Sequence, residues 1–207
     1  LQDLDALYGG REVMMSRLSD EAGVLKMRER KKARKWFDQF ETFFPQLFFS
    51  VYYGVLEDGS DIRQLGMWLL NRGVFEDVDS DRSNDGGVLL VVDVNSKTAF
   101  IAYGYLLDFY LTEEDTFHIL CKAHPHFLKG EHSKALKMIV YQLTKVLKKK
   151  SKKANRNPKK YQKLAGGFLA ENLSSHEFDG SKDEGNLETD SSILGVGGKE
   201  FDEEVTR

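Results

Sequence analysis

Two apolar runs joined by a short polar turn constrain the fold of this chain more than any other feature. The first run, residues 88–92, reads VLLVV, and its β-branched residues favour a buried strand. Asp93, Asn95 and Ser96 follow, and short polar side chains of this kind bond to nearby backbone and favour a tight turn. Residues 98–103 form the second predicted strand, so the pair indicates a β-hairpin.

Side chains in the second strand alternate between the two faces of the sheet, because the period of a strand is two residues. We therefore expect two sets of side chains on opposite faces. The first set is Phe100 and Ala102, and the second is Ala99, Ile101 and Tyr103.

Helical and strand patterns flank the hairpin on both sides. Residues 18–21 (LSDE) are typical of a capped helix start, and we expect a long basic helix from there to about Phe44, ended by Pro45. The other predicted elements are a strand over 46–55, a helix over 61–71 closed by Gly73, a helix that begins near 111–115 and is broken at Pro125, and a helix over about 131–149. This order predicts an α/β fold with a mixed β-sheet sandwiched by helices.

Length and composition predict one globular domain with appendages. Of the 207 residues we assign 1–17 to an N-terminal extension, 18–147 to the α/β domain, and 148–207 to a basic linker and an acidic, disordered tail. The net charge of -3 argues against a nucleic-acid partner. The only cysteine, Cys121, excludes an intrachain disulfide and a cysteine-based zinc site, and we expect it to be a buried thiol.

Carboxylates stand at both ends of the hairpin. Asp81 and Asp85 precede it, and Asp108 and Glu113 follow it. Because the two ends of an antiparallel hairpin lie at the same edge of a sheet, these acidic residues should meet at one rim. Hard divalent cations such as Ca²⁺ prefer several oxygen ligands, so the rim is a candidate metal site. The alternative is a solvated acidic turn.

Known site motifs are absent from the sequence. The alternating carboxylates of 77–85 resemble a calcium loop, but Arg82 replaces the glycine and Val88 the bidentate glutamate of the helix-loop-helix motif. Four histidines, at positions 118, 124, 126 and 132, surround Pro125, and we interpret them as structural or surface residues. No GxSxG, Walker or GxGxxG motif is present.

Two basic segments, 26–35 and 148–160, are candidates for binding anionic lipid or another polyanion. The simpler interpretation of each is a solvated helix face or linker, and for the first segment we favour it.

The hairpin and its flanks resemble the TPM domain family. The matching segments are 85–92 (DGGVLLVV), Ile101, 104–108 (GYLLD), 111–113 (LTE) and 125–131 (PHFLKGE), with 18–21 similar to the family's first-helix opening. The chain departs from the family pattern at Gly86 for Asn, Leu106 for Gly, Asp108 for Glu and Glu113 for Asp. That family includes thylakoid-lumen acid phosphatase-like proteins of photosystem II repair and membrane-anchored bacterial proteins.

The resemblance implies an α/β sandwich with a divalent-cation site, often calcium, at the acidic ends of the hairpin. Its ligands here would be Asp81, Asp85, Asp108 and Glu113. We expect the domain of a membrane-associated protein, extracytoplasmic or in an organelle lumen, with its targeting segment outside this chain. It would engage a protein partner, including a membrane-embedded one, or maintain a complex. The alternative is a weak metal-dependent acid phosphatase.

Overall fold

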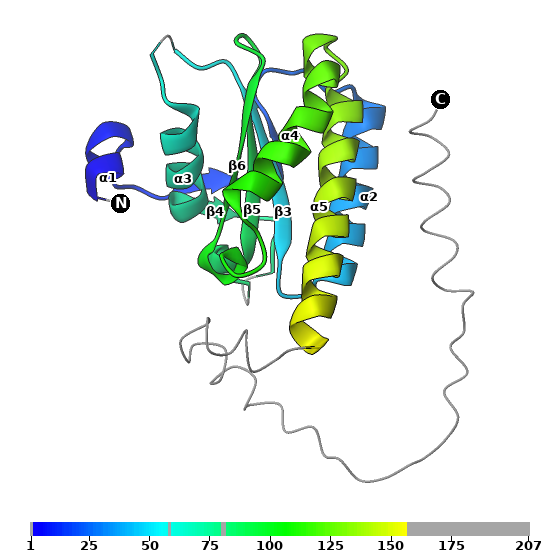
Figure 1. The fold of residues 1–207 in the computed structure, drawn as a ribbon. Helices are drawn as coiled ribbons and strands as arrows, with labels where there is room; N and C mark the ends of the chain where they lie inside the picture. Colours follow the sequence, from blue (N-terminus) through cyan, green and yellow to red (C-terminus); the bar gives the residue numbers. More distant parts are fainter. Residues whose placement is uncertain (1, 58, 80–81, 157–207) are drawn as a thin grey trace, which may run out of the picture. The chain divides into compact units, whose positions relative to one another are not determined.

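The computed structural model describes residues 2–57, 59–79 and 82–156 of the chain. A four-stranded sheet lies at its centre (Figure 1). In spatial order the strands are β2 (Leu18–Asp20), β3 (Phe48–Gly54), β5 (Gly87–Asp93) and β6 (Thr98–Tyr103). The β2–β3 and β3–β5 pairs are parallel, whereas β5–β6 is antiparallel. The predicted mixed sheet and its hairpin are therefore confirmed.

Helices cover both faces of this sheet (Figure 1). On one face pack α2 (Met27–Phe43), α4 (Glu113–Leu128) and α5 (His132–Arg156). On the other lie α1 (Gln2–Tyr8), α3 (Ile62–Arg72) and a small parallel pair of strands, β1 (Val13–Met15) and β4 (Gly73–Phe75). Short 3-10 helices η1 (Asn84–Gly86) and η2 (Tyr105–Leu107) flank the hairpin. None of the helices in the described ranges has the length and hydropathy needed to span a bilayer.

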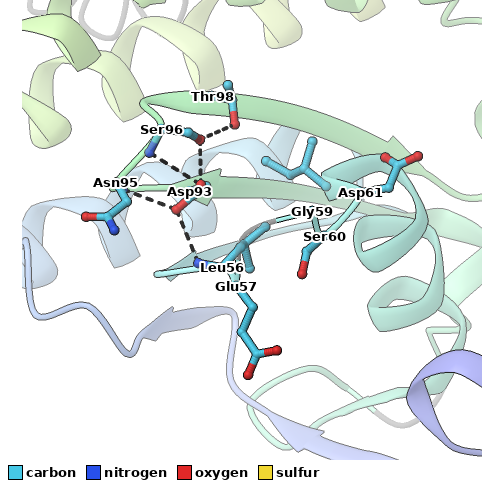
Figure 2. A pocket seen from close by; sticks show the side chains of 10 residues that line it. Leu56, Glu57, Gly59, Ser60, Asp61, Asp93, Asn95, Ser96 and Thr98 are labelled. Carbon is cyan, nitrogen blue, oxygen red and sulfur yellow. Dashed lines mark hydrogen bonds between the residues drawn. The ribbon is translucent and has the colours of Figure 1, made fainter.

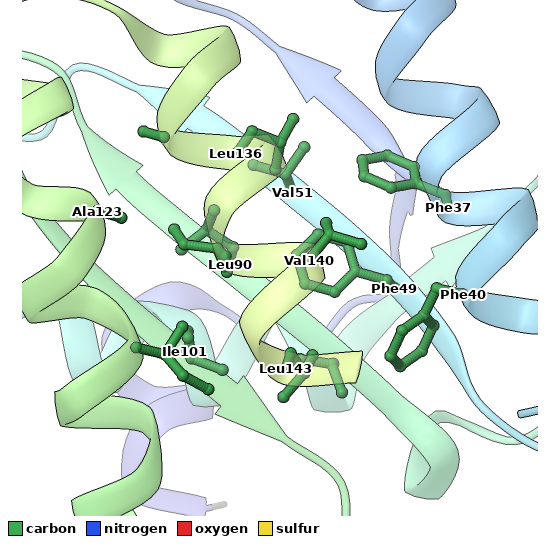
Figure 3. Packing of buried hydrophobic residues seen from close by; sticks show 14 of the residues in the cluster. Phe37, Phe40, Phe49, Val51, Leu90, Ile101, Ala123, Leu136, Val140 and Leu143 are labelled. Carbon is green, nitrogen blue, oxygen red and sulfur yellow. The ribbon is translucent and has the colours of Figure 1, made fainter. Parts of the chain in front are cut away.

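The sheet divides the core into two clusters, and the hairpin contributes to both. All seven residues of β5 are buried. Ile101 belongs to the larger cluster, which also contains Phe37, Phe49 and Leu143 and lies beneath α2, α4 and α5 (Figure 3). The predicted alternation along β6 is confirmed, because Phe100 and Ala102 belong to the smaller cluster and Ala99, Ile101 and Tyr103 to the larger one.

The predicted helix start at 18–21 is wrong. Residues Leu18–Asp20 form β2, which pairs with Val51–Tyr53, and α2 begins only after Lys26. The Asp20 carboxylate accepts hydrogen bonds from the backbone N–H groups of Val24 and Leu25. Asp20 therefore stabilises the turn between β2 and α2. Its sequence pattern is that of a helix cap, but the N–H groups that it binds precede the helix.

The predicted break at Pro125 is also wrong. The helix α4 continues through Pro125 to Leu128, and Pro125 lies on an exposed side of the helix together with Cys121. Proline removes the hydrogen bond to the residue four positions earlier, but an exposed Cys121 carbonyl can be solvated instead. Cys121 is thus exposed and not the buried thiol that we expected. The last helix also extends past the predicted end at Lys149, to Arg156.

Candidate functional site

The two ends of the hairpin approach each other closely. Asp85 lies in η1, directly before β5, and Asp108 follows η2 after β6. A Cβ atom added to Gly104 would lie 2.3 Å from the carbonyl oxygen of Asp85 and 2.4 Å from that of Asn84. Only a glycine admits this approach, so Gly104, the residue after β6, places η1 and η2 at one end of the sheet.

Carboxylates surround Tyr103 at this end. Burial raises the pKa of the Tyr103 hydroxyl, and the negative charges of Asp108, Glu113 and Asp115 raise it further. Asp108 is exposed, but neighbouring chain removes some water from its carboxyl group and raises its pKa. Asp115 behaves differently, because hydrogen bonds from Lys150 and Thr112 outweigh burial and lower its pKa.

The structure describes three of the four predicted metal ligands, and these three lie at the same end of the sheet. Asp85, Asp108 and Glu113 belong to this end of the sheet, whereas Asp81 lies outside the described residues. Within the described ranges, no three His, Cys, Asp or Glu side chains are placed to share an ion. Side chains of the described residues alone therefore do not form a three-ligand cage, and a cation here would also need backbone carbonyls or Asp81.

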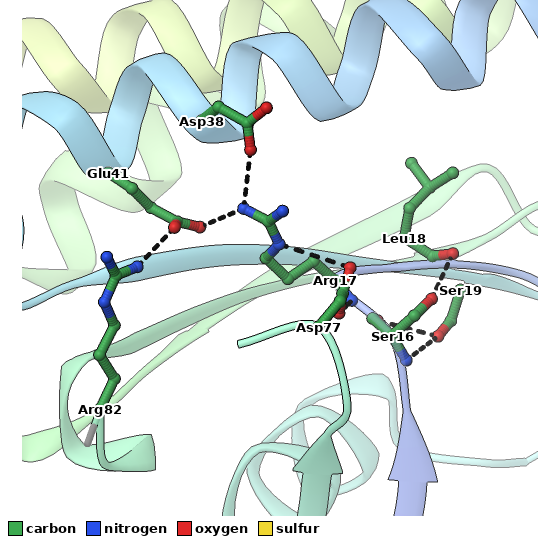
Figure 4. Close-up of polar contacts among 8 residues, drawn as sticks. All are labelled: Ser16, Arg17, Leu18, Ser19, Asp38, Glu41, Asp77 and Arg82. Carbon is green, nitrogen blue, oxygen red and sulfur yellow. Dashed lines mark hydrogen bonds and ion pairs between the residues drawn. The ribbon is translucent and has the colours of Figure 1, made fainter. Parts of the chain in front are cut away.

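Asp77, the first carboxylate of the acidic loop, is engaged in an ion-pair cluster around Arg17 (Figure 4). It accepts the Arg17 backbone N–H at 2.6 Å and lies 3.4 Å from the guanidinium. The same guanidinium contacts Glu41 at 2.5 Å and Asp38 at 3.1 Å, and Arg82 binds Glu41 from the other side at 2.5 Å. These contacts hold the acidic loop against α2, so Asp77 and Arg82 are both engaged in ion pairs.

A pocket of about 590 Å³ opens at the opposite end of β5 (Figure 2). Asp93 lies in its wall and accepts hydrogen bonds from the backbone N–H groups of Leu56 at 3.2 Å and Asn95 at 3.1 Å, and from the Ser96 hydroxyl at 2.5 Å. These bonds lower the pKa of Asp93 although burial opposes the shift. The sequence predicted the turn but not the pocket, and the bonds to Asp93 show that its carboxylate closes the turn.

The outer edge of β6 forms a third site. No strand within the described ranges pairs with that edge. A smaller pocket of about 140 Å³ lies over it, between the N-terminal turns of α3 and α4. Its lining residues are Ile62, Arg63, Ala99, Phe100, Glu113, Thr116, Phe117 and Leu120. We call this surface the β6 groove.

A model of the TPM domain matches residues 18–146. The chain belongs to the TPM domain family. This match covers β2 to α5 and includes the hairpin, η1 and η2. In this TPM domain Gly104, which opens the segment GYLLD, is the glycine that admits the backbone of Asp85.

Two solved structures are similar to this TPM domain. The N-terminal domain of cg2496 protein from Corynebacterium glutamicum has a TM-score of 0.50 and 11% identity, over 66% of this chain and 82% of that one. The N-terminal domain of a protein from P. gingivalis has a TM-score of 0.51 and 19% identity, over 70% of this chain and 87% of that one. At these identities the likeness shows the fold alone. No curated protein matched the sequence.

Two histidines of the TPM domain, His126 and His132, have structural surroundings, whereas His118 and His124 are exposed. The ring of His126 lies 2.7 Å from the Glu131 carboxylate. His132 packs edge-on against Tyr53, with ring centroids 5.5 Å apart, and its Nδ1 is buried without a hydrogen-bond partner among the described residues. Burial lowers the pKa of His132.

Proposed function

We propose that this TPM domain is a protein-interaction module of a membrane-associated assembly, and that it pairs an extended segment of its partner with the edge of β6. The observation that carries the proposal is the coincidence of an open strand edge with the β6 groove. Strand addition combines main-chain hydrogen bonds with pockets for alternate side chains, and both are available here.

The register of the hairpin identifies the backbone groups that would bond the partner. The Gly104 N–H donates to the Gly87 carbonyl at 2.9 Å. In an antiparallel ladder every second residue faces the partner strand, so Thr98, Phe100 and Ala102 bond to β5. The backbone groups that face the open edge belong to Ala99, Ile101 and Tyr103.

Side chains beside this edge suit an apolar partner. Phe117 is 64% exposed on α4, at one wall of the β6 groove, and Phe100 lies at the other. The Arg63 guanidinium stacks on the Phe100 ring at 5.7 Å from its centroid. Natural edges are often protected by proline or by inward-pointing charge, and residues 98–103 contain neither. Phe117 therefore supports recognition of apolar side chains, while Arg63 and Glu113 offer one charge of each sign.

Selection from a displayed library of extended peptides of about ten residues tests this proposal. Selected peptides should bind the wild type. Their affinity for the Ala99→Pro variant should be about tenfold lower, because the proline removes one outward N–H donor. Since Ala99 makes no ladder bond to β5, the substitution leaves the hairpin bonds in place. Bound peptide should also slow amide exchange at Ile101 and Tyr103.

The control is Ala99→Val, which keeps the N–H and suits a strand. It should bind the selected peptides more tightly than Ala99→Pro does, because only the proline removes the donor, although the valine side chain also lines the groove. A second variant, Phe117→Ser, should also lower the affinity for these peptides, because it removes an apolar contact in the β6 groove and leaves the backbone of β6 unchanged. The proposal is overturned if no peptide is selected, or if selected peptides bind wild type and Ala99→Pro equally.

Metal-dependent hydrolysis of phosphomonoesters is a second candidate. It is supported by the shared position of Asp85 and Asp108 at one end of the sheet and by the raised pKa of Asp108, which suits a proton donor. We assign no catalytic step, because the described side chains do not complete a metal site. Hydrolysis of p-nitrophenyl phosphate that requires added metal and disappears in Asp85→Ala would establish this activity.

A further inference from the structure

A basic surface covers the outer sides of α2 and α5. The helix α5 contains eight lysines and one arginine but no aspartate or glutamate. The helix α2 has six basic residues in its first nine positions. We propose that this surface docks the domain on an anionic lipid bilayer.

The two helices run side by side in the same direction, so their charges share one surface (Figure 1). At their C-terminal halves, the Lys148 ammonium lies over the Phe43 ring, 3.0 Å from its centroid. At their N-terminal ends, the charge of Glu29 on α2 acts on His132, the first residue of α5. Both helices bury their apolar sides in the larger core cluster, which leaves the lysines outside.

Most of these basic side chains have no acidic partner among the described residues. Arg30 pairs with Asp20, and Lys150 pairs with Asp115. Exposed basic residues that make no ion pair within the described ranges include Arg28, Lys31, Lys32, Arg34 and Lys35 on α2 and Lys145, Lys149 and Lys152 on α5. Burial and the charge of Lys152 lower the pKa of Lys148, which shows like-charge crowding. An external layer of negative charge would relieve it.

Exposed apolar side chains at both ends of α2 favour a bilayer over a nucleic acid. Met27 is 71% exposed and Phe43 is 48% exposed, at the two ends of α2 and about 24 Å apart along its axis. Surfaces that lie on membranes combine lysine and arginine with apolar side chains that enter the headgroup region. Anionic headgroups attract each nearby lysine or arginine, so these eight basic residues, unpaired within the described ranges, supply a substantial attraction. The helix α2 contacts β2 and β3, whereas β6 is the opposite edge strand of the sheet. The β6 edge therefore remains accessible to a partner when α2 and α5 lie on a bilayer.

Sedimentation of the full chain with vesicles tests this inference. Vesicles of phosphatidylcholine with about 30% phosphatidylglycerol should carry the protein down, and pure phosphatidylcholine should not. The triple variant Lys31→Gln, Lys35→Gln, Lys149→Gln should lower the partition coefficient at least about tenfold. Raising NaCl from about 0.1 to about 0.5 M should weaken binding of the wild type similarly.

The matched control removes three exposed charges elsewhere, as Arg11→Gln, Lys97→Gln, Lys129→Gln, and should bind as the wild type does. Circular dichroism confirms that both triple variants fold. The inference is overturned if the wild type does not sediment with the anionic vesicles, or if the control variant loses as much binding. Binding of a single-stranded RNA with loss in the same triple variant, and no vesicle binding, would assign the surface to nucleic acid instead and overturn it too.

Discussion

A Cβ atom on Gly104 would lie 2.3 Å from the carbonyl oxygen of Asp85. The neighbour that it would meet is backbone and cannot rotate away. The backbone angle φ of Gly104 is -78°, so a side chain is excluded by contact with η1 and not by backbone conformation. This contact fixes how the two ends of the hairpin meet.

Substitution of Gly104 by alanine should lower the free energy of unfolding by about 3 kcal/mol, because η1 must move away from the end of β6. Urea denaturation followed by circular dichroism measures the change. Gly10→Ala is the matched control, since the nearest neighbour of a Cβ there is 4.0 Å away, and it should be close to neutral. Equal stability of the Gly104→Ala variant and the wild type would show that η1 and η2 are not in this contact.

A calcium titration tests the proposed cation site at the rim. We expect Ca²⁺ to raise the melting temperature only at about millimolar concentration, because the described carboxylates do not form a complete cage. Asp85→Asn and Asp108→Asn should each abolish the shift. Asp61→Asn, in the pocket at the other end of β5, is the control and should retain it. The absence of any shift in the wild type would remove calcium from consideration.

Arg17→Met should destabilise the domain by about 2 kcal/mol, since it removes charged hydrogen bonds to Glu41 and Asp77 and leaves Glu41 largely buried. Asp38→Asn should cost under about 0.5 kcal/mol, because the Asp38 side chain is 62% exposed. Thermal or urea unfolding of both variants checks the difference. Equal losses would show that Arg17 is not the centre of the cluster.

The stability should fall as pH is lowered through the ordinary pKa of histidine. Burial lowers the pKa of His132 below 6.5, so between the two values the unfolded chain binds more protons than the folded one. The loss therefore begins on acidification from about pH 7.5 and levels off below the folded-state pKa. His132→Phe keeps an aromatic ring against Tyr53 and should remove this part of the profile. An unchanged profile in that variant would contradict the assignment.

A separate loss of stability is expected at lower pH. Hydrogen bonds from Lys134 and His126 lower the pKa of Glu131 from 4.5 to about 2. The contribution of Glu131 to stability is fully present above pH 4.5 and is lost as pH falls towards the folded-state pKa. Glu131→Gln should reduce the pH dependence of stability below pH 4.5, while the pH dependence due to His132 remains. A steep profile in the variant would place the acid-sensitive group elsewhere.

The sequence by itself determined the elements whose signals are local. The apolar runs of the hairpin, its turn at Asp93 and the alternation of Phe100 with Ile101 all appeared as expected, because a strand has a period of two and an aspartate closes its own turn. The assignment of helices to both faces of the sheet also followed from the order of elements. The hairpin features depend on neighbours only a few residues apart, and the layering depends only on the order of the elements.

Tertiary structure decided what depends on distant neighbours. Residues 18–20 carry a helix-start pattern, yet they form β2 because β3 offers a parallel ladder and Asp20 bonds to the turn that follows. The helix α4 passes through Pro125 because that position faces solvent. The approach of Gly104 to Asp85, the cluster around Arg17 and the open edge of β6 arise from packing between separate segments. Sequence patterns carry no direct signal for such contacts, since each requires the chain to be closed around its core first.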